Sequence, residues 1–531
     1  MLCIQDLYFN SCSAIEKREG FPLFSHPTLY TSVCKHWAQI ALSSPQLWSF
    51  IIVFAVIDRP RIVTGGIPDG KPTSVTFLPP LPVVRRSIEL SKTSSLAFSV
   101  RPWHEIMWKY PNDLYTQAVK PMLEEIFVPH HTRWRRVALQ WCPQDDFPFL
   151  LDKVPSFPAL EHLALGDSPF STGPPHEDYA AGAIHILSTA PQLNSLEIDF
   201  FIYQPYSDFL PGDTCPRIMA VIPWERLTRL SLQLGKLDVL AALNLLGEQC
   251  PNLKDLEVTV DHVINLDPEV VLPKVCHNHL EELAFMFPDY PSCTAVLNQL
   301  TLPNIRSIQL PSASHQDSEE VIRNALVESF QKLIQRSACQ LRKLYYSASI
   351  HTPHDFESTL MMLRSVSSSL EELEIEAQGV DILADALSVP ADADLRDILC
   401  PRLRFVKFDL RNMTASPNVV DMVRSRWNPP SHLGVSRLQE LDIYVTLNEE
   451  LGEATESDWD PPNPLALRET IEGLRALARD SAANPFGANA WPQVIRVGSL
   501  VHSDTEDDAD GQYTYLDTSS TDPGTPRFHP W

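Results

Sequence analysis

The stretch Leu370-Glu371-Glu372-Leu373-Glu374-Ile375 follows a pattern of leucine, two residues, leucine, one residue and an apolar residue. Ten copies of this pattern begin 25 to 36 residues apart. They are Leu160-Leu163-Leu165, Leu193-Leu196-Ile198, Leu227-Leu230-Leu232, Leu253-Leu256-Val258, Leu280-Leu283-Phe285, Ile305-Ile308-Leu310, Leu341-Leu344-Tyr346, Leu370-Leu373-Ile375, Leu403-Val406-Phe408 and Leu438-Leu441-Ile443, with a looser copy at Trp134-Val137-Leu139. Repetition at this period predicts one supersecondary unit stacked many times.

Each repeat has the same internal order. The last apolar positions alternate with period two, which predicts a short strand with its apolar side inward. Several stretches between the strands have helical periodicity, namely 238–249, 318–336, 356–366 and 380–387. A repeated strand, helix and parallel strand is right-handed. We therefore predict an α/β fold: a leucine-rich-repeat-like solenoid of horseshoe form, with a curved parallel sheet inside and helices outside.

Size and charge narrow the class of protein. A chain of 531 residues is too long for one compact core, whereas stacked repeats bury their apolar faces against their neighbours. The net charge of −25 argues against nucleic acid and against an anionic membrane surface as partners. No segment has the roughly 18 consecutive apolar residues that a spanning helix needs. The longest apolar run, residues 47–57, predicts a buried strand or short helix.

The ten cysteines form no C-x-x-C pair. Four of them, Cys250, Cys276, Cys339 and Cys400, precede the first leucine of a repeat, where a small apolar residue can fill the turn. The sequence also has no G-x-S-x-G, H-E-x-x-H or G-x-G-x-x-G motif. We expect no catalytic residues, no metal and no cofactor, and a reducing compartment, the cytoplasm or the nucleus.

Composition divides the chain into five parts. Prolines and glycines without periodicity indicate an irregular connector, and the repeat fades near residue 447, after which residues 464–480 predict one helix. Acidic residues without apolar periodicity predict a disordered tail. The expected parts are 1–57 as a helical module, 58–82 as the connector, 83–446 as the repeats, 447–502 as a C-terminal cap with one helix, and 503–531 as the tail.

The N-terminal part contains a tryptophan signature. Residues 33–51 read VCKHWAQIALSSPQLWSFI, in which Val33, Trp37, Ile40 and Ala41 share one face of a predicted helix. Ser44-Pro45 would end that helix, because the residue before proline is disfavoured in the α region. Leu47 and Trp48 would then fold back on Trp37, with both tryptophan rings largely in a core.

This signature resembles the second half of an F-box. The phrase V-C-x-x-W-x-x-I-A-x-x-x-P-x-L-W is similar in particular to F-box-plus-repeat proteins of basidiomycete fungi. Residues 87–100 and 131–139 resemble two strands that follow in that family. The family's leucine-proline opening is missing, and only residues 2–12 could be a remnant of its first helix, so the module is expected to be degenerate or truncated.

The resemblance implies a function. In that family the F-box binds a Skp-type adaptor of a cullin-type ubiquitin ligase, and the repeats hold a protein substrate. The residues that would form the adaptor surface or the F-box core are Val33, Cys34, Trp37, Ile40, Ala41, Pro45, Leu47 and Trp48. We expect a non-catalytic substrate-recognition subunit without nucleic-acid or membrane partners; the alternative is an interaction scaffold whose degenerate F-box no longer recruits a ligase.

The polar residues of the later strands alternate in charge. Basic residues of the seventh and ninth repeats neighbour acidic residues of the eighth and tenth. One interpretation is charge pairing between neighbouring strands. The other is a recognition surface on the concave face for an acidic or aromatic segment of a partner. In that case the binding residues would be Arg342, Lys343, Tyr345, Phe405 and Lys407.

Overall fold

A computed structural model of the chain divides into two compact units, Met1–Gly235 and Lys236–Trp531. The described residues are 27–57, 74–102, 112–139, 153–166, 177–199, 220–237, 239–263, 271–287, 289–311, 320–349, 353–378, 380–390, 394–411, 417–427, 429–448, 472–474, 476–477 and 494–502. Each unit is a mixed α/β structure with a mostly parallel sheet and several helices. This is the α/β class that the leucine pattern predicts.

In the first unit the strand order is β2-β1-β3-β4-β5-β6-β7. Among the strands that the structure describes in this unit, only the pairing of β2 with β1 is antiparallel. The strands are β1 (Phe50–Ile57), β2 (Val75–Leu78), β3 (Leu96–Pro102), β4 (Trp134–Leu139), β5 (His162–Gly166), β6 (Ser195–Asp199) and β7 (Arg229–Leu237). The helices are α2 (Thr28–Val33), α3 (Lys35–Leu42), α4 (Pro45–Trp48), α5 (Leu81–Ser91), α6 (Asn112–Met122) and α8 (Glu177–Thr189), with short turns η2 (Leu123–Phe127), η3 (Val128–Arg133) and η4 (Trp224–Arg226).

In the second unit the strand order is β8-β10-β12-β13-β14-β15-β16-β17. Its strands are β8 (Asp255–Val263), β10 (Glu282–Met286), β12 (Ser307–Leu310), β13 (Lys343–Ser349), β14 (Glu372–Gln378), β15 (Phe405–Arg411), β16 (Glu440–Asn448) and β17 (Val494–His502), with a small separate pair β9 (Val275–Cys276) and β11 (Leu300–Thr301). Its helices are α10 (Val239–Asn244), α11 (Tyr290–Gln299), α12 (Glu320–Ser337), α13 (Pro353–Val366), α14 (Val380–Leu387) and α15 (Pro417–Trp427), with η5 (Leu245–Gln249), η6 (Leu395–Asp397) and η7 (Ser431–Leu433).

The leucine pattern sets the register of the strands. In the second unit the middle position of every repeat is aligned in one row, as Leu344, Leu373 and Val406 show for β13, β14 and β15. These side chains are at most 2% exposed. Leu163 and Leu196 are aligned in the same way in the first unit. Equivalent residues of successive repeats therefore form continuous apolar rows, as predicted.

A second row, of backbone hydrogen bonds, lies where the strands begin. The carbonyl oxygen of Arg342 accepts hydrogen bonds from the backbone N–H groups of Glu371 and Glu372, both at 2.8 Å. The carbonyl of Glu371 accepts from Arg404 and Phe405 in the same way, at 2.8 and 3.1 Å. Each repeat thus fixes the start of the next strand before the regular ladder begins.

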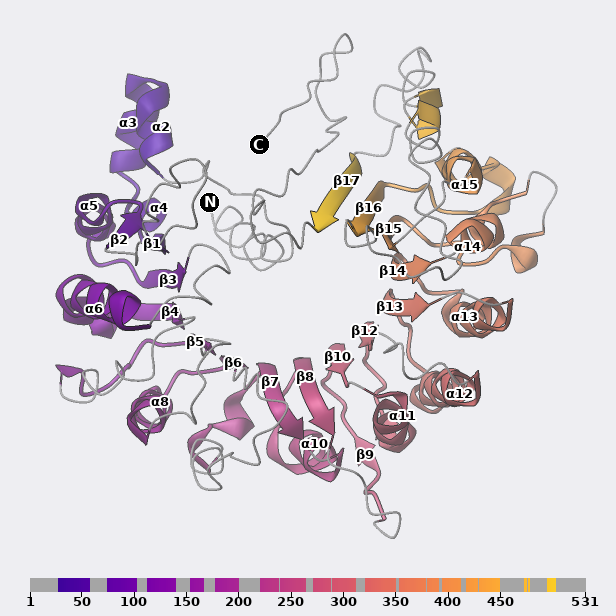
Figure 1. Cartoon of the computed structure of the whole chain (residues 1–531), viewed down its shortest axis with the longest axis horizontal. Coiled ribbons are helices and arrows are strands. Elements are labelled where there is room, and N and C mark those ends of the chain that lie inside the picture. The colour runs from indigo at the N-terminus through magenta and orange to yellow at the C-terminus, as the bar shows by residue number, and fades with distance from the viewer. Residues whose placement is uncertain are drawn as a thin grey trace, which may run out of the picture. The chain divides into compact units, whose positions relative to one another are not determined.

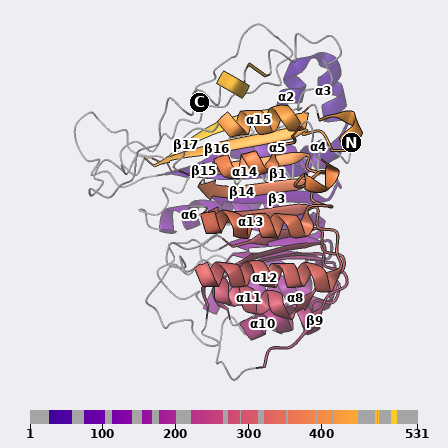
Figure 2. The same ribbon diagram turned by 90° about the vertical axis from the view of Figure 1, so that its right-hand side faces the viewer.

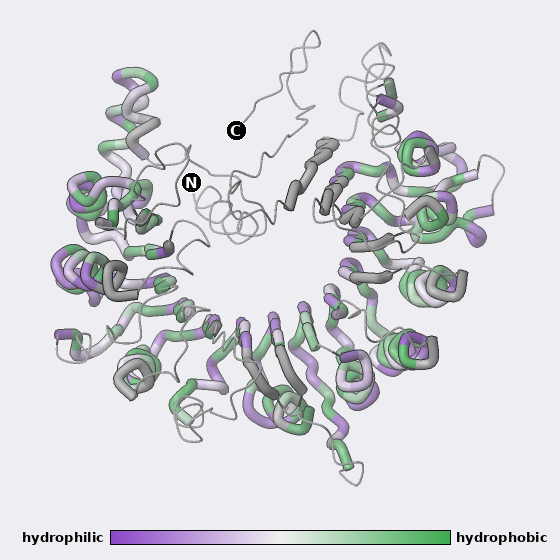
Figure 3. Tube along the Cα trace, viewed as in Figure 1, coloured by the Kyte–Doolittle hydropathy of each residue, from purple (hydrophilic) through white to green (hydrophobic). Residues whose placement is uncertain are grey.

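The helices of the second unit lie on one side of its strands. Figures 1 and 2 show α12, α13 and α14 side by side against β12 to β15. The helices predicted at 238–249, 318–336, 356–366 and 380–387 are present as α10 with η5, α12, α13 and α14. Leu326, Phe330 and Leu333 of α12 are fully buried. In Figure 3 the strands of this unit carry both hydrophobic and hydrophilic residues, as expected of a sheet whose two faces differ.

Three segments differ from the sequence-based expectation. Strand β2 and the start of α5 lie within 74–82, where we expected only irregular connector; residues 58–73 lie outside the described part. Residues 87–91 belong to α5 rather than to a strand, and β3 begins at Leu96. The apolar run near residue 50 forms β1, as predicted. The C-terminal region contains β17 in addition to helical residues at 472–474 and 476–477.

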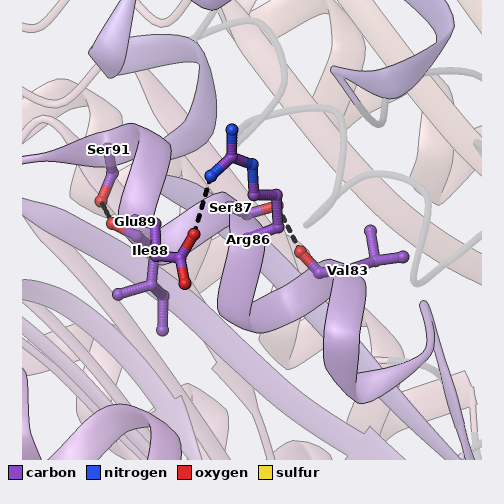
Figure 4. A network of polar contacts seen from close by, with 6 residues as sticks. All are labelled: Val83, Arg86, Ser87, Ile88, Glu89 and Ser91. Atoms are coloured by element: carbon purple, nitrogen blue, oxygen red, sulfur yellow. Dashed lines mark hydrogen bonds and ion pairs between the residues drawn. The ribbon is translucent and has the colours of Figure 1, made fainter.

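Helix α5 contains two buried serines within the segment that was expected to be a strand. Both serine hydroxyls donate hydrogen bonds to backbone carbonyls of the same helix. Ser87 Oγ donates to Val83 O at 3.0 Å, and Ser91 Oγ donates to Ile88 O at 2.6 Å (Figure 4). Arg86 and Glu89 form an ion pair of 2.8 Å on the solvent side. Because both serines are buried, the internal bonds satisfy hydroxyls that water cannot reach. Residues 92–95, which lie between the end of α5 and the start of β3, form a turn.

The described helices were also compared with the length and hydropathy that a membrane crossing requires. None of them, within the ranges given above, is both long and apolar enough. The predicted tail at 503–531 lies outside those ranges.

Candidate functional site

The N-terminal helices form the first candidate site. The helical conformation is interrupted at Cys34, whose backbone is extended (φ −163°, ψ 167°). Helix α2 therefore ends at Val33, and α3 begins at Lys35. The Cys34 thiol caps α3 by accepting from the Trp37 backbone N–H at 3.5 Å. The prediction of one continuous helix through Val33 and Ala41 is therefore wrong, because the cysteine interrupts it.

Trp48 lies in the core of this module, as predicted. It is 3% exposed, and its indole Nε1–H donates to the Ala41 carbonyl at 2.8 Å. Ala41 itself is 1% exposed. Pro45 occupies the first turn of α4, where its missing N–H costs nothing, and Leu47 is half-buried in the same helix. The helix α4 therefore folds back on the end of α3.

Trp37 differs from this expectation. It is 49% exposed, with Ile40 at 41% and Val33 at 65%. Leu42, which ends α3, is also exposed. Exposed large apolar side chains are scarce elsewhere in the described chain, so their concentration in α2 and α3 is unusual. We call Val33, Trp37, Ile40 and Leu42 the α2–α3 patch.

The second candidate site is the polar face of the second unit's sheet. It consists of the strand residues that lie between the buried apolar positions of each strand and therefore point to the opposite face of the sheet. Lys343 and Tyr345 lie on β13, and Phe405 and Lys407 lie on β15. Strand β14 separates them, so the two pairs lie roughly 10 Å apart, twice the spacing of neighbouring strands. Tyr345, Phe405 and Lys407 are half-buried, whereas Lys343 is exposed.

Both lysines of this face form ion pairs with β14. Lys343 Nζ lies 2.6 Å from Glu372 Oε2, and Lys407 Nζ contacts Glu374 Oε1. The register places Lys343 opposite Glu372 and Glu374 opposite Lys407, so the pairs follow directly from the strand alignment. For these two lysines the structure supports the interpretation of charge pairing between strands.

Arg342 lies outside this alternation. It precedes β13 by one residue and is exposed, and its backbone N–H donates to the Arg306 carbonyl at 2.8 Å. Its neighbours at the equivalent repeat position are Arg306 and Glu371. Arg342 thus belongs to a row at the strand starts rather than to the sheet face.

The first unit has a different polar row. Register aligns Arg136, His162, Ser195 and Arg229 across β4 to β7. His162 Nδ1 lies 2.7 Å from Ser195 Oγ. Burial, and then the charges of Arg229 and Arg136, lower the pKa of His162 to about 4. His162 is therefore neutral near pH 7, and this row carries positive charge on its arginines alone.

Sequence reasoning missed a set of side chains that connect neighbouring repeats. Arg426, fully buried on α15, donates to the carbonyls of Leu387, Leu399 and Cys400. Arg336 on α12 similarly donates to Leu297 and Leu300. Arg426 and Arg336 each donate to a carbonyl 39 residues earlier, that of Leu387 and of Leu297, but the acceptors are backbone groups, so no residue type marks these bonds in the sequence.

The cysteines of the turns are partly as predicted. Cys250 and Cys400 are fully buried, and burial raises the pKa of each thiol to about 12. Cys276 differs, because it is exposed on β9. Among the described residues, no three histidine, cysteine or carboxylate side chains come together in a way that could hold a metal ion.

Comparisons with known proteins give little further information. The sequence matches no protein-family model, and it matches no curated protein. A crystal structure of a structural-genomics target from Bacteroides fragilis aligns with 50% of this chain at 15% identity and a TM-score of 0.29. The aligned part spans 64% of that protein.

Proposed function

We propose that the chain is a non-catalytic substrate-recognition subunit of a cullin-type ubiquitin ligase. In this proposal the repeats form a leucine-rich-repeat-like solenoid with a curved sheet, and α2 to α4 form a small F-box-like cap. The cap binds a Skp-type adaptor, the sheet binds a protein substrate, and the complex acts in the cytoplasm or nucleus. The resemblance of residues 33–51 to an F-box supplies the connection to ubiquitin.

The observation that carries the proposal is the exposure of the α2–α3 patch. Trp37 and Ile40 belong to the phrase that resembles the F-box, and they lie on the surface while Trp48 and Ala41 form the core. A small helical module can fold by burying one apolar surface in its core, so a second apolar surface that stays exposed is not required for folding. Four exposed apolar side chains in two short helices suit a surface that becomes buried on binding a partner.

Co-purification tests the adaptor. The full chain would be co-expressed with a fungal Skp-type adaptor and isolated by a tag on the chain. We expect the adaptor to be recovered with it, and Trp37→Ala with Ile40→Ala to abolish recovery. The control is Ile382→Ala on α14, whose side chain is as exposed as that of Trp37. Absence of the adaptor with the unmodified chain would favour the scaffold without a ligase, whereas equal recovery in all three proteins would show that the adaptor does not bind through the α2–α3 patch.

A further inference from the structure

Strand β17 ends the sheet of the second unit. Its nine residues lie parallel to β16, and the register runs from Val494 opposite Glu440 to His502 opposite Asn448 (Figure 1). Among the strands that the structure describes, β16 is the one neighbour of β17. The backbone N–H and C=O groups on the other side of β17 therefore form an edge at which a further strand can be added.

The helical residues of the same repeat are closely packed. Leu474 and Leu477 are 3% and 6% exposed. A Cβ atom added at Gly473 would come within 2.9 Å of Val420 Cγ2 on α15, so these two segments are in close contact. The last repeat is thus packed on the repeat before it, and stacked repeats require a cap on the outer side of such a unit.

Strand β17 lacks the features that usually protect a sheet edge. Protected edge strands are short, carry lysine or proline, or contain a bulge. Strand β17 is nine residues long, and five of them are valine, isoleucine or leucine, with no proline, lysine or carboxylate. Its register with β16 is continuous. An edge of this composition pairs with another strand unless it is covered.

The sequence that follows β17 contains a segment suited to cover it. Residues 512–518 read QYTYLDT and lie outside the described residues. Tyrosine and threonine, which favour strands, occupy four of these seven positions. Asp510-Gly511 directly before them favours a reversal of the chain. The connection 503–511 can span roughly 30 Å, whereas paired strands are roughly 4.8 Å apart.

We propose that residues 512–518 pair antiparallel with the outer edge of β17 and prevent this edge from pairing with a second copy of the chain. The unprotected edge requires a cover, and this segment is tethered to the end of the strand that it would cover. The proposal is independent of the ligase role. It limits the disorder expected of 503–531 to the acidic connection and to the residues after 518.

Hydrogen exchange of the full chain, read by mass spectrometry, tests the pairing. We expect protected amides in 512–518 and on both sides of β17. Thr514→Pro with Tyr515→Pro removes two successive N–H donors, one of which faces β17 in either register. This variant should lose protection in about half of the amides of 494–502, those that face away from β16. Light scattering should show that the variant associates with increasing concentration.

The control is Ser520→Pro with Thr521→Pro, which adds two prolines to the same tail beyond the proposed strand and should leave exchange in β17 unchanged. Unchanged exchange of β13 to β15 in both variants checks that the repeats remain folded. Equal exchange of 494–502 in the unmodified chain and in the Thr514 and Tyr515 variant would overturn the pairing. So would a dimer of the unmodified chain whose β17 amides lose protection on dilution, because a second copy would then occupy the edge. If the variant keeps the mass of the unmodified chain at every concentration, the protective role is wrong.

Discussion

At the scale of single residues, the buried arginine on α15 shows how a charge can connect repeats without an acidic partner. Arg426 donates to three backbone carbonyls, those of Leu387, Leu399 and Cys400. Burial lowers the pKa of its guanidinium to about 10, which leaves it charged at neutral pH. The positive charge is therefore stabilised by carbonyl dipoles of the preceding repeat.

Replacement of this arginine should be costly. Arg426→Met keeps the volume but removes all three bonds, and we expect the free energy of unfolding to fall by about 3 kcal/mol. Arg424→Met is the control two residues away, because Arg424 is exposed and pairs with the equally exposed Asp421. That change should cost less than about 0.5 kcal/mol. Urea denaturation measures both, and equal midpoints would contradict the role of Arg426.

His162 makes stability depend on pH. Its pKa is about 4 in the folded protein, against 6.5 for an ordinary histidine, so the unfolded chain binds the extra proton between these values. Stability from this group is complete above pH 6.5 and declines as pH falls toward 4, by roughly 2 to 3 kcal/mol. Arg136, Arg229 and Ser195 are the groups aligned beside it. His162→Gln should reduce the change in melting temperature between pH 6.5 and pH 4. An unchanged dependence of the melting temperature on pH would contradict the role of His162.

At the scale of elements, the two tryptophans of the N-terminal helices separate folding from binding. Trp48 is buried and bonded to Ala41, so Trp48→Ala should cost about 3 to 5 kcal/mol within α2 to α4. Trp37→Ala should cost about 1 kcal/mol or less, since the ring is half exposed. Hydrogen exchange of residues 27–48 measures both. Loss of protection in Trp37→Ala equal to that in Trp48→Ala would mean that Trp37 has a structural role.

The same helices show what sequence could and could not predict about the site. Spacing identified Trp48 and Ala41 as core, and proline placed the break before α4. Spacing failed at Cys34, because a thiol accepting one backbone N–H can cap a helix that looks continuous in sequence. Spacing also placed Trp37 in the core, whereas its ring is 49% exposed.

At the scale of the whole chain, the leucine rows were predictable because the same spacing of apolar residues recurs in every repeat of the sequence. Charge pairing between neighbouring strands was one of the two interpretations that the sequence allowed, and Lys343 and Lys407 form such pairs with β14. The bonds of Arg426 were not predicted, since it donates to backbone carbonyls, which every residue has. The sequence therefore predicts contacts that follow from the register of the repeats, and the structure is needed for side-chain bonds to the backbone of another repeat.

This difference has a measurable consequence for stability. Leu373 is 2% exposed and aligned with Leu344 on β13 and Val406 on β15. Leu373→Asn places an unpaired amide in the apolar row, at a cost of about 3 to 5 kcal/mol. Because each repeat packs mainly on its neighbours, hydrogen exchange should accelerate most in β13 to β15. Leu395→Asn, at an exposed position, is the control. Equal acceleration of β5 and β6 in the first unit would show that the chain unfolds as one cooperative body instead.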